Sequence, residues 1–135
     1  FGRNPGTEER SIPLEKIKLP HRHSEGEDIV LLQEELDRID DFRTVAEIFR
    51  QLDDTTRIRI FWLLCHCEEC VLNISAMMRM SSPAVSHHLR SLKNSGLLVS
   101  RREGKEVYYR AADTAQGRLL HQMIEQIMEI TCPKR

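Results

Sequence analysis

The apolar residues in the first half of this 135-residue chain recur at helical spacing. Over residues 28–52 they return every three or four positions, which predicts one long helix or two consecutive helices with a break near residues 40–41. The stretch 54–64 is richer in apolar residues, and Asp54 or Thr55 stands where an N-cap belongs. We therefore expect a buried helix there, at the centre of the core.

A short helix followed by an amphipathic one is predicted next. The short helix covers about 73–79, and Ser81 and Ser82 then cap a second helix with Pro83 in its first turn and Gly96 at its end. At about 100° per residue the second helix keeps its apolar residues in one narrow sector. That sector contains Val85, Leu89 and Leu92. The rest of its surface is polar and faces outward.

The chain closes with a hairpin and a last helix. Two β-like runs within 97–112 flank the turn at 103–105, and Asp113 with Gln116 resembles a capping box that opens the last helix. The apolar stripe of this helix is broader than a small monomer needs, which suggests dimerisation through the terminal helices. The predicted fold class is mainly α with a small β-hairpin wing, a dimeric winged helix-turn-helix.

Three segments are expected along the chain. Residues 1–28 hold three of the five prolines and little apolar periodicity, which is typical of an extended or disordered arm. Residues 29–131 would form the winged helix-turn-helix domain, and 132–135 a C-terminal tail.

Composition narrows the setting of the protein. No run approaches the roughly 20 apolar residues that a membrane-spanning helix needs, so we expect no membrane partner. The four cysteines are too few and too clustered for a disulfide scaffold. We therefore expect a cytoplasmic protein with reduced thiols. No glycine-rich phosphate loop and no nucleophile with a base is evident, so an enzyme is not expected.

The net charge of −1 conceals a separation of charge along the chain. Residues 25–54 contain eleven acids and three arginines, whereas residues 76–110 contain seven basic residues and two acids. Because screening limits attraction to roughly 10 Å, a phosphate backbone senses the local basic surface rather than the net charge. Double-stranded DNA is therefore a candidate partner.

The predicted winged helix places polar and basic side chains where a duplex would lie. The outer face of the second helix fits a major groove about 12 Å wide, and the hairpin reaches phosphates or the minor groove. From this placement the candidate DNA contacts are His87, Arg90, Ser91 and Lys93 on the helix, with Arg101, Arg102 and Lys105 on the hairpin. His88 borders the apolar sector, and we interpret it as structural.

From about residue 42 to 130 the sequence resembles the ArsR/SmtB family of winged-helix repressors. The similarity rests on "LDDTTRIRIFWLL", on "SSPAVSHHLRSLKNSGLL" and on "SRREGKEVYYRAAD", in family order and spacing. It implies a homodimer on an imperfect palindromic operator, whose affinity for DNA falls when a metal or metalloid binds. The resemblance also implies the DNA-reading residues, which would be Ser82, Pro83, Ser86, His87, Arg90, Arg102 and Lys105.

A cluster of thiols is the candidate inducer site. The motif "CHCEEC" spaces its cysteines as in some arsenic and cadmium sensors, although Leu72 replaces a cysteine of the family pattern. Thiolates favour Zn(II), Cd(II) or As(III). Sharing one ion requires the chain to leave helical form near His66, because residues 65 and 67 lie about 200° apart on a helix. The alternative is a buried core cysteine with two incidental thiols. The candidate ligands are Cys65, Cys67, Cys70 and Cys132.

The last helix carries a second set of possible ligands. Asp113 and Glu129 match the ends of the family's site on this helix, but alanine and glutamine stand where the family has histidines, so we do not expect zinc there. His121 and Glu125 share one face with Glu129 at four-residue spacing. That face is compatible with chelation, and we interpret it as a hydrated, ion-paired surface.

Two alternatives to metal-responsive repression stay open at this point. In the first, DNA binding responds to a reversible disulfide between Cys67 and either Cys70 or Cys132. In the second, the chain is a protein-interaction module whose last helix binds a partner, without DNA binding.

Overall fold

The structure is a computed structural model that describes residues 18–21, 23 and 28–132. The chain forms two units, residues 1–47 and 48–135, and each is described by itself. Most of the predicted arm 1–28 lies outside the described residues, as does the predicted tail apart from Cys132. The predicted domain boundaries therefore stay predictions.

The predicted N-terminal helical region is two helices rather than one. Helix α1 spans Ile29–Leu36 and begins at Asp28, whose carboxylate accepts a hydrogen bond from a backbone N–H in the first turn. Helix α2 spans Ile39–Gln51 and runs from the first unit into the second. The break lies at residues 37–38, so its expected position at 40–41 was wrong. Those two aspartates instead occupy the first turn of α2, where a carboxylate favours the positive helix end.

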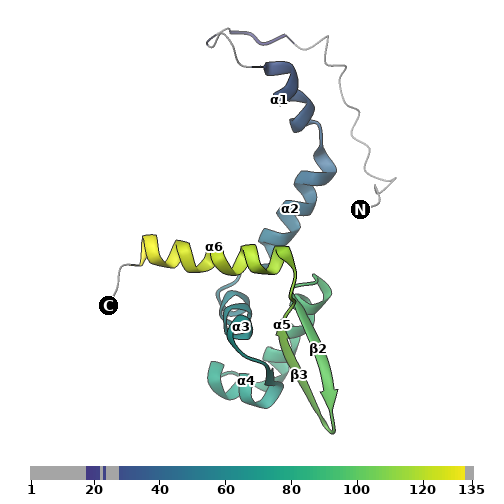
Figure 1. Ribbon diagram of the computed structural model, residues 1–135, viewed down its shortest axis with the longest axis vertical. Coiled ribbons are helices and arrows are strands. Elements are labelled where there is room, and N and C mark those ends of the chain that lie inside the picture. The colour runs from purple at the N-terminus through teal and green to yellow at the C-terminus, as the bar shows by residue number, and fades with distance from the viewer. Residues whose placement is uncertain (1–17, 22, 24–27, 133–135) are drawn as a thin grey trace. The chain divides into compact units, whose positions relative to one another are not determined.

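The second unit is the predicted helix-turn-helix with its hairpin (Figure 1). Helix α3 is capped by Asp54, as expected, and α5 by Ser81. Between α4 and α5 the chain turns at Arg79, which adopts the left-handed conformation with φ 55°. The elements are α3 Thr55–His66, β1 Glu69–Cys70, α4 Val71–Met78, α5 Ser82–Asn94, β2 Leu98–Glu103, β3 Glu106–Ala111 and α6 Ala115–Thr131.

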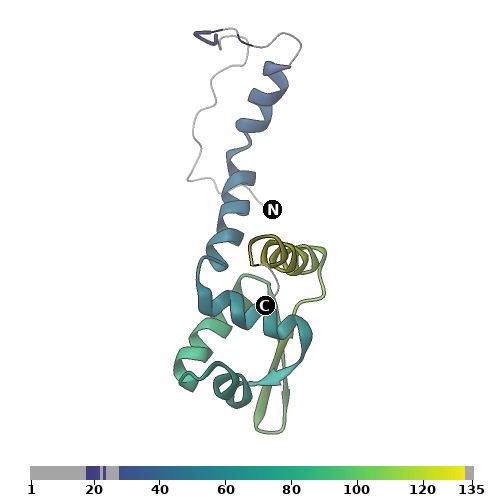
Figure 2. The same cartoon turned by 90° about the vertical axis from the view of Figure 1, so that its left-hand side faces the viewer.

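The hairpin belongs to a three-stranded antiparallel sheet in the order β1-β3-β2. Strands β2 and β3 pair from Leu98 with Ala111 to Glu103 with Glu106, and Gly104 occupies the turn with φ 62°. The two-residue strand β1 was not predicted. In the two views of Figures 1 and 2 the hairpin tip lies at the opposite end of this unit from α6.

The core of the second unit is the one that the apolar pattern predicted. The three apolar residues of the α5 sector are fully buried, and they pack with buried residues of α3, α4, β2 and α6. Helix α6 begins one residue later than expected, because Thr114 rather than Asp113 caps it: the Thr114 hydroxyl accepts from the backbone N–H of Gly117 at 3.0 Å. The fold is thus mainly helical, with a winged helix-turn-helix at its centre.

Helix length and hydropathy bear on membrane contact. Within the part of the chain that the structure describes, no helix combines the length and the apolar character that crossing a membrane requires.

Candidate nucleic-acid interface and inducer site

Helix α5 presents the predicted polar face to solvent. Pro83, His87, Arg90 and Lys93 are exposed, whereas the three predicted serine contacts are half-buried. One of these, Ser91, donates to the side-chain carbonyl of Gln51 at 2.9 Å, which fastens α5 to the end of α2 within the same unit. Ser91 therefore has a structural partner, and its contact with DNA stays a prediction.

The predicted basic contacts divide into two groups. Among the residues that the structure describes, Arg90, Arg102 and Lys105 form no ion pair and remain exposed. Lys93 donates to the Ser100 hydroxyl at 2.7 Å, between α5 and the hairpin. The first group is therefore available to phosphates without breaking an internal contact.

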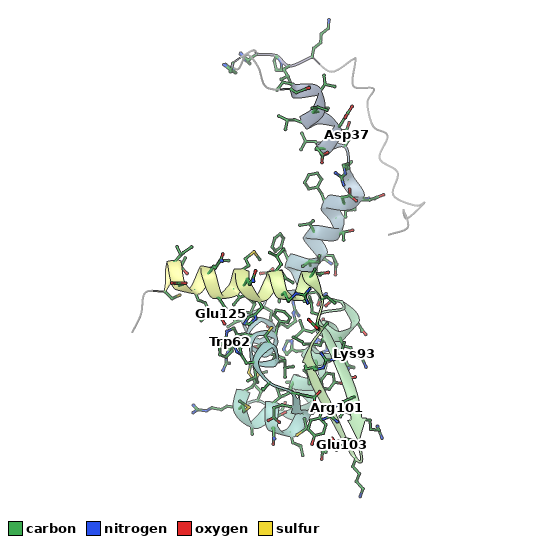
Figure 3. All side chains as sticks on the ribbon, in the orientation of Figure 1. Asp37, Trp62, Lys93, Arg101, Glu103 and Glu125 are labelled. Carbon is green, nitrogen blue, oxygen red and sulfur yellow. The ribbon has the colours of Figure 1, made fainter. Side chains whose placement is uncertain are left out.

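Arg101 is held on the hairpin instead (Figure 3). Its guanidinium contacts the carboxylates of Glu68 at 2.6 Å and Glu103 at 2.7 Å, and it lies 4.7 Å from the ring centre of Tyr108. The hydrogen bond from Arg101 is the main reason that the pKa of Glu68 lies below its ordinary value. The predicted phosphate contact from Arg101 thus competes with two carboxylates.

The environment of His88 fits the structural interpretation in part. Its Nδ1 atom is buried and has no hydrogen-bond partner among the described residues, while its ring meets that of His87 edge-on at 5.6 Å. A buried polar atom without a partner is unfavourable, so His88 is not an optimised core residue.

All four cysteines, each of them within the described residues, are free thiols. Helix α3 ends at His66 and the backbone of Cys67 is extended, which meets the condition set for the two thiols to approach one ion. Burial raises the pKa of Cys65 to about 11 and also raises that of Cys67. Cys70 is buried and Cys132 is exposed. The cysteine ligand set stays a prediction.

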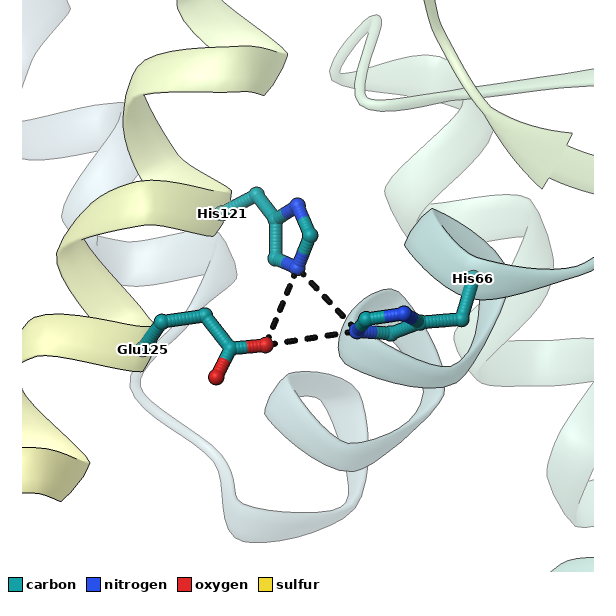
Figure 4. Close-up of side chains that lie close together, drawn as sticks. All are labelled: His66, His121 and Glu125. Carbon is teal, nitrogen blue, oxygen red and sulfur yellow. Dashed lines mark hydrogen bonds and ion pairs between the residues drawn. The ribbon is translucent and has the colours of Figure 1, made fainter.

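Three other side chains meet at the end of α3. Figure 4 shows His66 from α3 facing His121 and Glu125 from α6. The two Nε2 atoms are 3.2 Å apart, and each is 3.2 Å from Oε1 of Glu125. Within the described part of the chain, these three residues form a group whose possible metal-ligand atoms lie close together.

The carboxylate of Glu125 is fixed by a third group. The indole N–H of Trp62, one turn before His66 on α3, donates to Oε1 at 2.8 Å. This hydrogen bond is the main reason that the pKa of Glu125 lies below its ordinary value. Hydrogen bonds from the two histidines lower the pKa further, whereas burial raises it. Glu125 is therefore ionised at neutral pH.

A cavity of about 350 Å³ adjoins this cluster. His66 and His121 line it together with Cys65, Cys67 and Asp113. The carboxylate of Asp113 pairs with Arg118 at 2.6 Å on the exposed surface. The cavity thus brings two of the four predicted thiols and the two histidines to one region of the surface, whereas Cys70 and Cys132 do not line it.

Sequence reasoning noticed these ligands separately but did not join them. His66 was considered as a neighbour of the thiols, and His121 with Glu125 as one helix face. The helical spacing of four residues is visible in the sequence, but the partner lies 55 residues away from His121. Glu129, the third residue of that face, lies outside the cluster.

Similarity to known proteins agrees with this architecture. The family described as "Bacterial regulatory protein, arsR family" matches residues 54–100. A transcriptional repressor SmtB homolog of Synechocystis is 35% identical over 103 residues, which cover 76% of this chain and 78% of that protein. A cadmium resistance transcriptional regulatory protein CadC homolog of Staphylococcus aureus is 43% identical over 70 residues, 51% of this chain and 58% of that one.

Among solved structures, a homodimeric winged helix-turn-helix DNA-binding domain from Mycobacterium bovis is 25% identical, with a TM-score of 0.60. The match covers 83% of this chain and 94% of that domain. With the described helix-turn-helix and wing, these similarities show that the chain belongs to the ArsR/SmtB family of DNA-binding transcriptional repressors.

Proposed function

We propose that this repressor acts as a homodimer that binds an operator duplex with α5 and the wing, and that binding of a metal or metalloid lowers its affinity for DNA. The observation that carries the proposal is the exposed polar face of α5 beside a hairpin on which Arg102 and Lys105 are exposed and form no ion pair with any described residue. This activity takes place where the operator DNA lies, which we take to be the cytoplasm.

The DNA contacts proposed are the ten predicted from the sequence, with unequal roles. Arg90, Arg102 and Lys105 are the phosphate or base contacts, because they are exposed and have no ion pair among the described residues. Lys93 and Arg101 reach the duplex only after exchanging internal partners. Ser82, Pro83, Ser86, His87 and Ser91 complete the surface of α5 that faces the groove.

Uncovered apolar side chains support the homodimer. On α6, Leu119, Ile127 and Ile130 are at least half exposed, and they fall on one side of the helix at about 100° per residue. Apolar surface of this kind marks an interface. A two-fold dimer would set its two α5 helices one DNA turn apart, about 34 Å.

The inducer class proposed is Zn(II), Cd(II) or As(III). A cadmium resistance regulator is among the relatives, and the four cysteines supply the sulfur that soft ions prefer.

A mobility-shift titration tests the proposal. The full chain is titrated onto DNA from its own promoter region, with and without Zn(II), Cd(II) or As(III). We expect specific binding that at least one of the three ions weakens by about 5- to 150-fold, which corresponds to a coupling of about 1–3 kcal/mol. Equal affinity with all three ions would refute metal responsiveness, and a complete lack of DNA binding would refute the DNA contacts.

A further inference from the structure

We propose that His66 Nε2, His121 Nε2 and Glu125 Oε1 form a binding site for a divalent transition-metal ion of the zinc class, separate from the cysteines. Its regulatory consequence rests on the proposed function, but binding itself does not. The site joins the last residue of α3 to the middle of α6.

The spacing of the three atoms matches the coordination of zinc. In a tetrahedral site with bonds of about 2.0–2.1 Å, neighbouring ligand atoms are about 3.3 Å apart. The three edges here are each 3.2 Å. An ion about 2.05 Å from all three atoms would lie roughly 0.9 Å from their plane. The geometry accommodates such an ion with little movement of the side chains.

Hydrogen bonding alone does not satisfy this triangle. A neutral imidazole carries one N–H, and a carboxylate only accepts. If both histidines donate to Glu125 from Nε2, then two N–H groups face each other across the 3.2 Å edge between the rings. If one of the histidines accepts on that edge, it no longer donates to the carboxylate. A cation would bind one lone pair of each of the three atoms in place of these contacts, and no N–H groups would then face each other.

The surroundings of the trio are typical of an ion site with an open position. His66 and Glu125 keep 47% and 46% of their side-chain surface exposed, so water can occupy a fourth position. Trp62 orients the carboxylate through its hydrogen bond to Oε1. A fixed carboxylate and two imidazoles form a hard and borderline donor set, which suits zinc, cobalt or nickel rather than As(III).

The position on α6 leaves the site open in the proposed dimer. At about 100° per residue, His121 and Glu125 lie roughly 165° from the middle of the face formed by Leu119, Ile127 and Ile130. The core residues of the helix lie between these two faces. An ion at the trio would therefore connect α3 and α6 within one protomer, without a ligand from a second copy.

Cobalt titration of the full chain carrying Cys65→Ser and Cys67→Ser, freed of metal with a chelator, tests the site, because these two changes disrupt the proposed cysteine site. Co(II) bound to two imidazoles and a carboxylate gives visible ligand-field bands but no thiolate-to-cobalt charge-transfer band. We expect one ion per protomer, displaced by Zn(II), with a simultaneous change in the fluorescence of Trp62, the one tryptophan of the chain.

Variants distinguish the ligands from their neighbours. His121→Gln or Glu125→Gln should weaken Co(II) binding by at least about 10- to 100-fold, the range that loss of even an outer partner produces. Trp62→Phe, which removes a positioning donor, should weaken it by about 10-fold with an altered ligand-field spectrum. Glu129→Gln, made in the same cysteine-to-serine background, is the control that should leave Co(II) binding unchanged. Circular dichroism verifies that every variant is folded.

Two results would overturn the site. One is a lack of Co(II) ligand-field bands in the folded Cys65→Ser, Cys67→Ser variant, since the ion then binds only through sulfur. The other is unchanged Co(II) binding by folded His121→Gln and Glu125→Gln. Neither result depends on DNA, so loss of operator binding in a separate titration would refute the proposed function and leave the ion site standing.

Discussion

The salt dependence of DNA binding offers a direct test of how the basic residues are divided. Arg90 is exposed and has no ion pair among the described residues, whereas Arg101 is already paired with Glu68 and Glu103. Each phosphate that a protein neutralises adds about 0.9 to the slope of log K against log salt concentration. Arg90→Ala in the proposed dimer removes two contacts, so the slope should fall by about 1.8.

That slope predicts a measurable change in affinity. Between 50 and 200 mM salt the ratio of wild-type to Arg90→Ala affinity should shrink by about 12-fold, which is a factor of four raised to the power 1.8. Arg101→Ala should lower the slope by less than half as much, because its guanidinium neutralises carboxylates rather than phosphates. Fluorescence anisotropy with a labelled 30-bp duplex, about three helical turns long, provides the measurement.

Arg118→Ala is the matched control, since it removes the same charge from the exposed surface of α6, where Arg118 pairs with Asp113. A slope that falls equally in the Arg90 and Arg118 variants would show that only net charge matters, and would refute the assignment of α5 to the duplex. A slope that falls as much for Arg101 as for Arg90 would refute the division into free and paired cations.

Three further predictions concern stability, each measured by urea unfolding followed by circular dichroism. Asp54→Ala should lower the free energy of unfolding by about 0.5–2 kcal/mol at pH 7. The backbone N–H of Arg57 lowers the pKa of the Asp54 carboxyl in the folded state, so this stabilisation is present above the unfolded pKa near 4 and disappears as the pH falls below it. The stabilities of the variant and the wild type should therefore converge in acid. Gly117→Ala should destabilise by about 1–3 kcal/mol, although alanine usually favours a helix, because the new Cβ would lie 2.8 Å from the carbonyl oxygen of Ala112; a gain in stability would contradict this. Arg79→Gly should stabilise by about 1 kcal/mol since φ is 55° there, whereas Arg79→Ala, which keeps the strain, should not.

The sequence predicted most elements of the second unit because the capping residues, apolar spacing and turn residues that define each element lie within a few positions of each other. The cap at Asp54, the buried sector of α5 and the hairpin turn at Gly104 each depend on neighbouring residues alone. Strand β1 escaped prediction because two residues carry no periodicity, and Glu69 becomes a strand only by pairing with Tyr109. The cap of α6 shifted to Thr114 because its hydroxyl reaches the backbone N–H three residues on.

The candidate ion site shows the same limit in a functional setting. Spacing on α6 placed His121 and Glu125 on one face, but it did not distinguish a ligand pair from a solvated surface. What decides between them is the packing of α3 against α6, which brings His66 and Trp62 to the same carboxylate. That packing depends on buried residues elsewhere on both helices, so no local pattern around the ligands reveals it.

Helix α3 connects the proposed ion site to the proposed DNA-reading surface by direct packing. Its buried residues Ile60 and Phe61 belong to the same core cluster as Leu89 and Leu92 of α5, while its last two turns supply Trp62 and His66. An ion that fixes these turns against α6 therefore acts on the helix that supports α5. Linkage makes the effect reciprocal: if the ion weakens DNA binding 10-fold, DNA must weaken ion binding 10-fold. The ion regulates only if DNA-bound and free repressor hold the trio differently, because equal affinity for both states would shift neither.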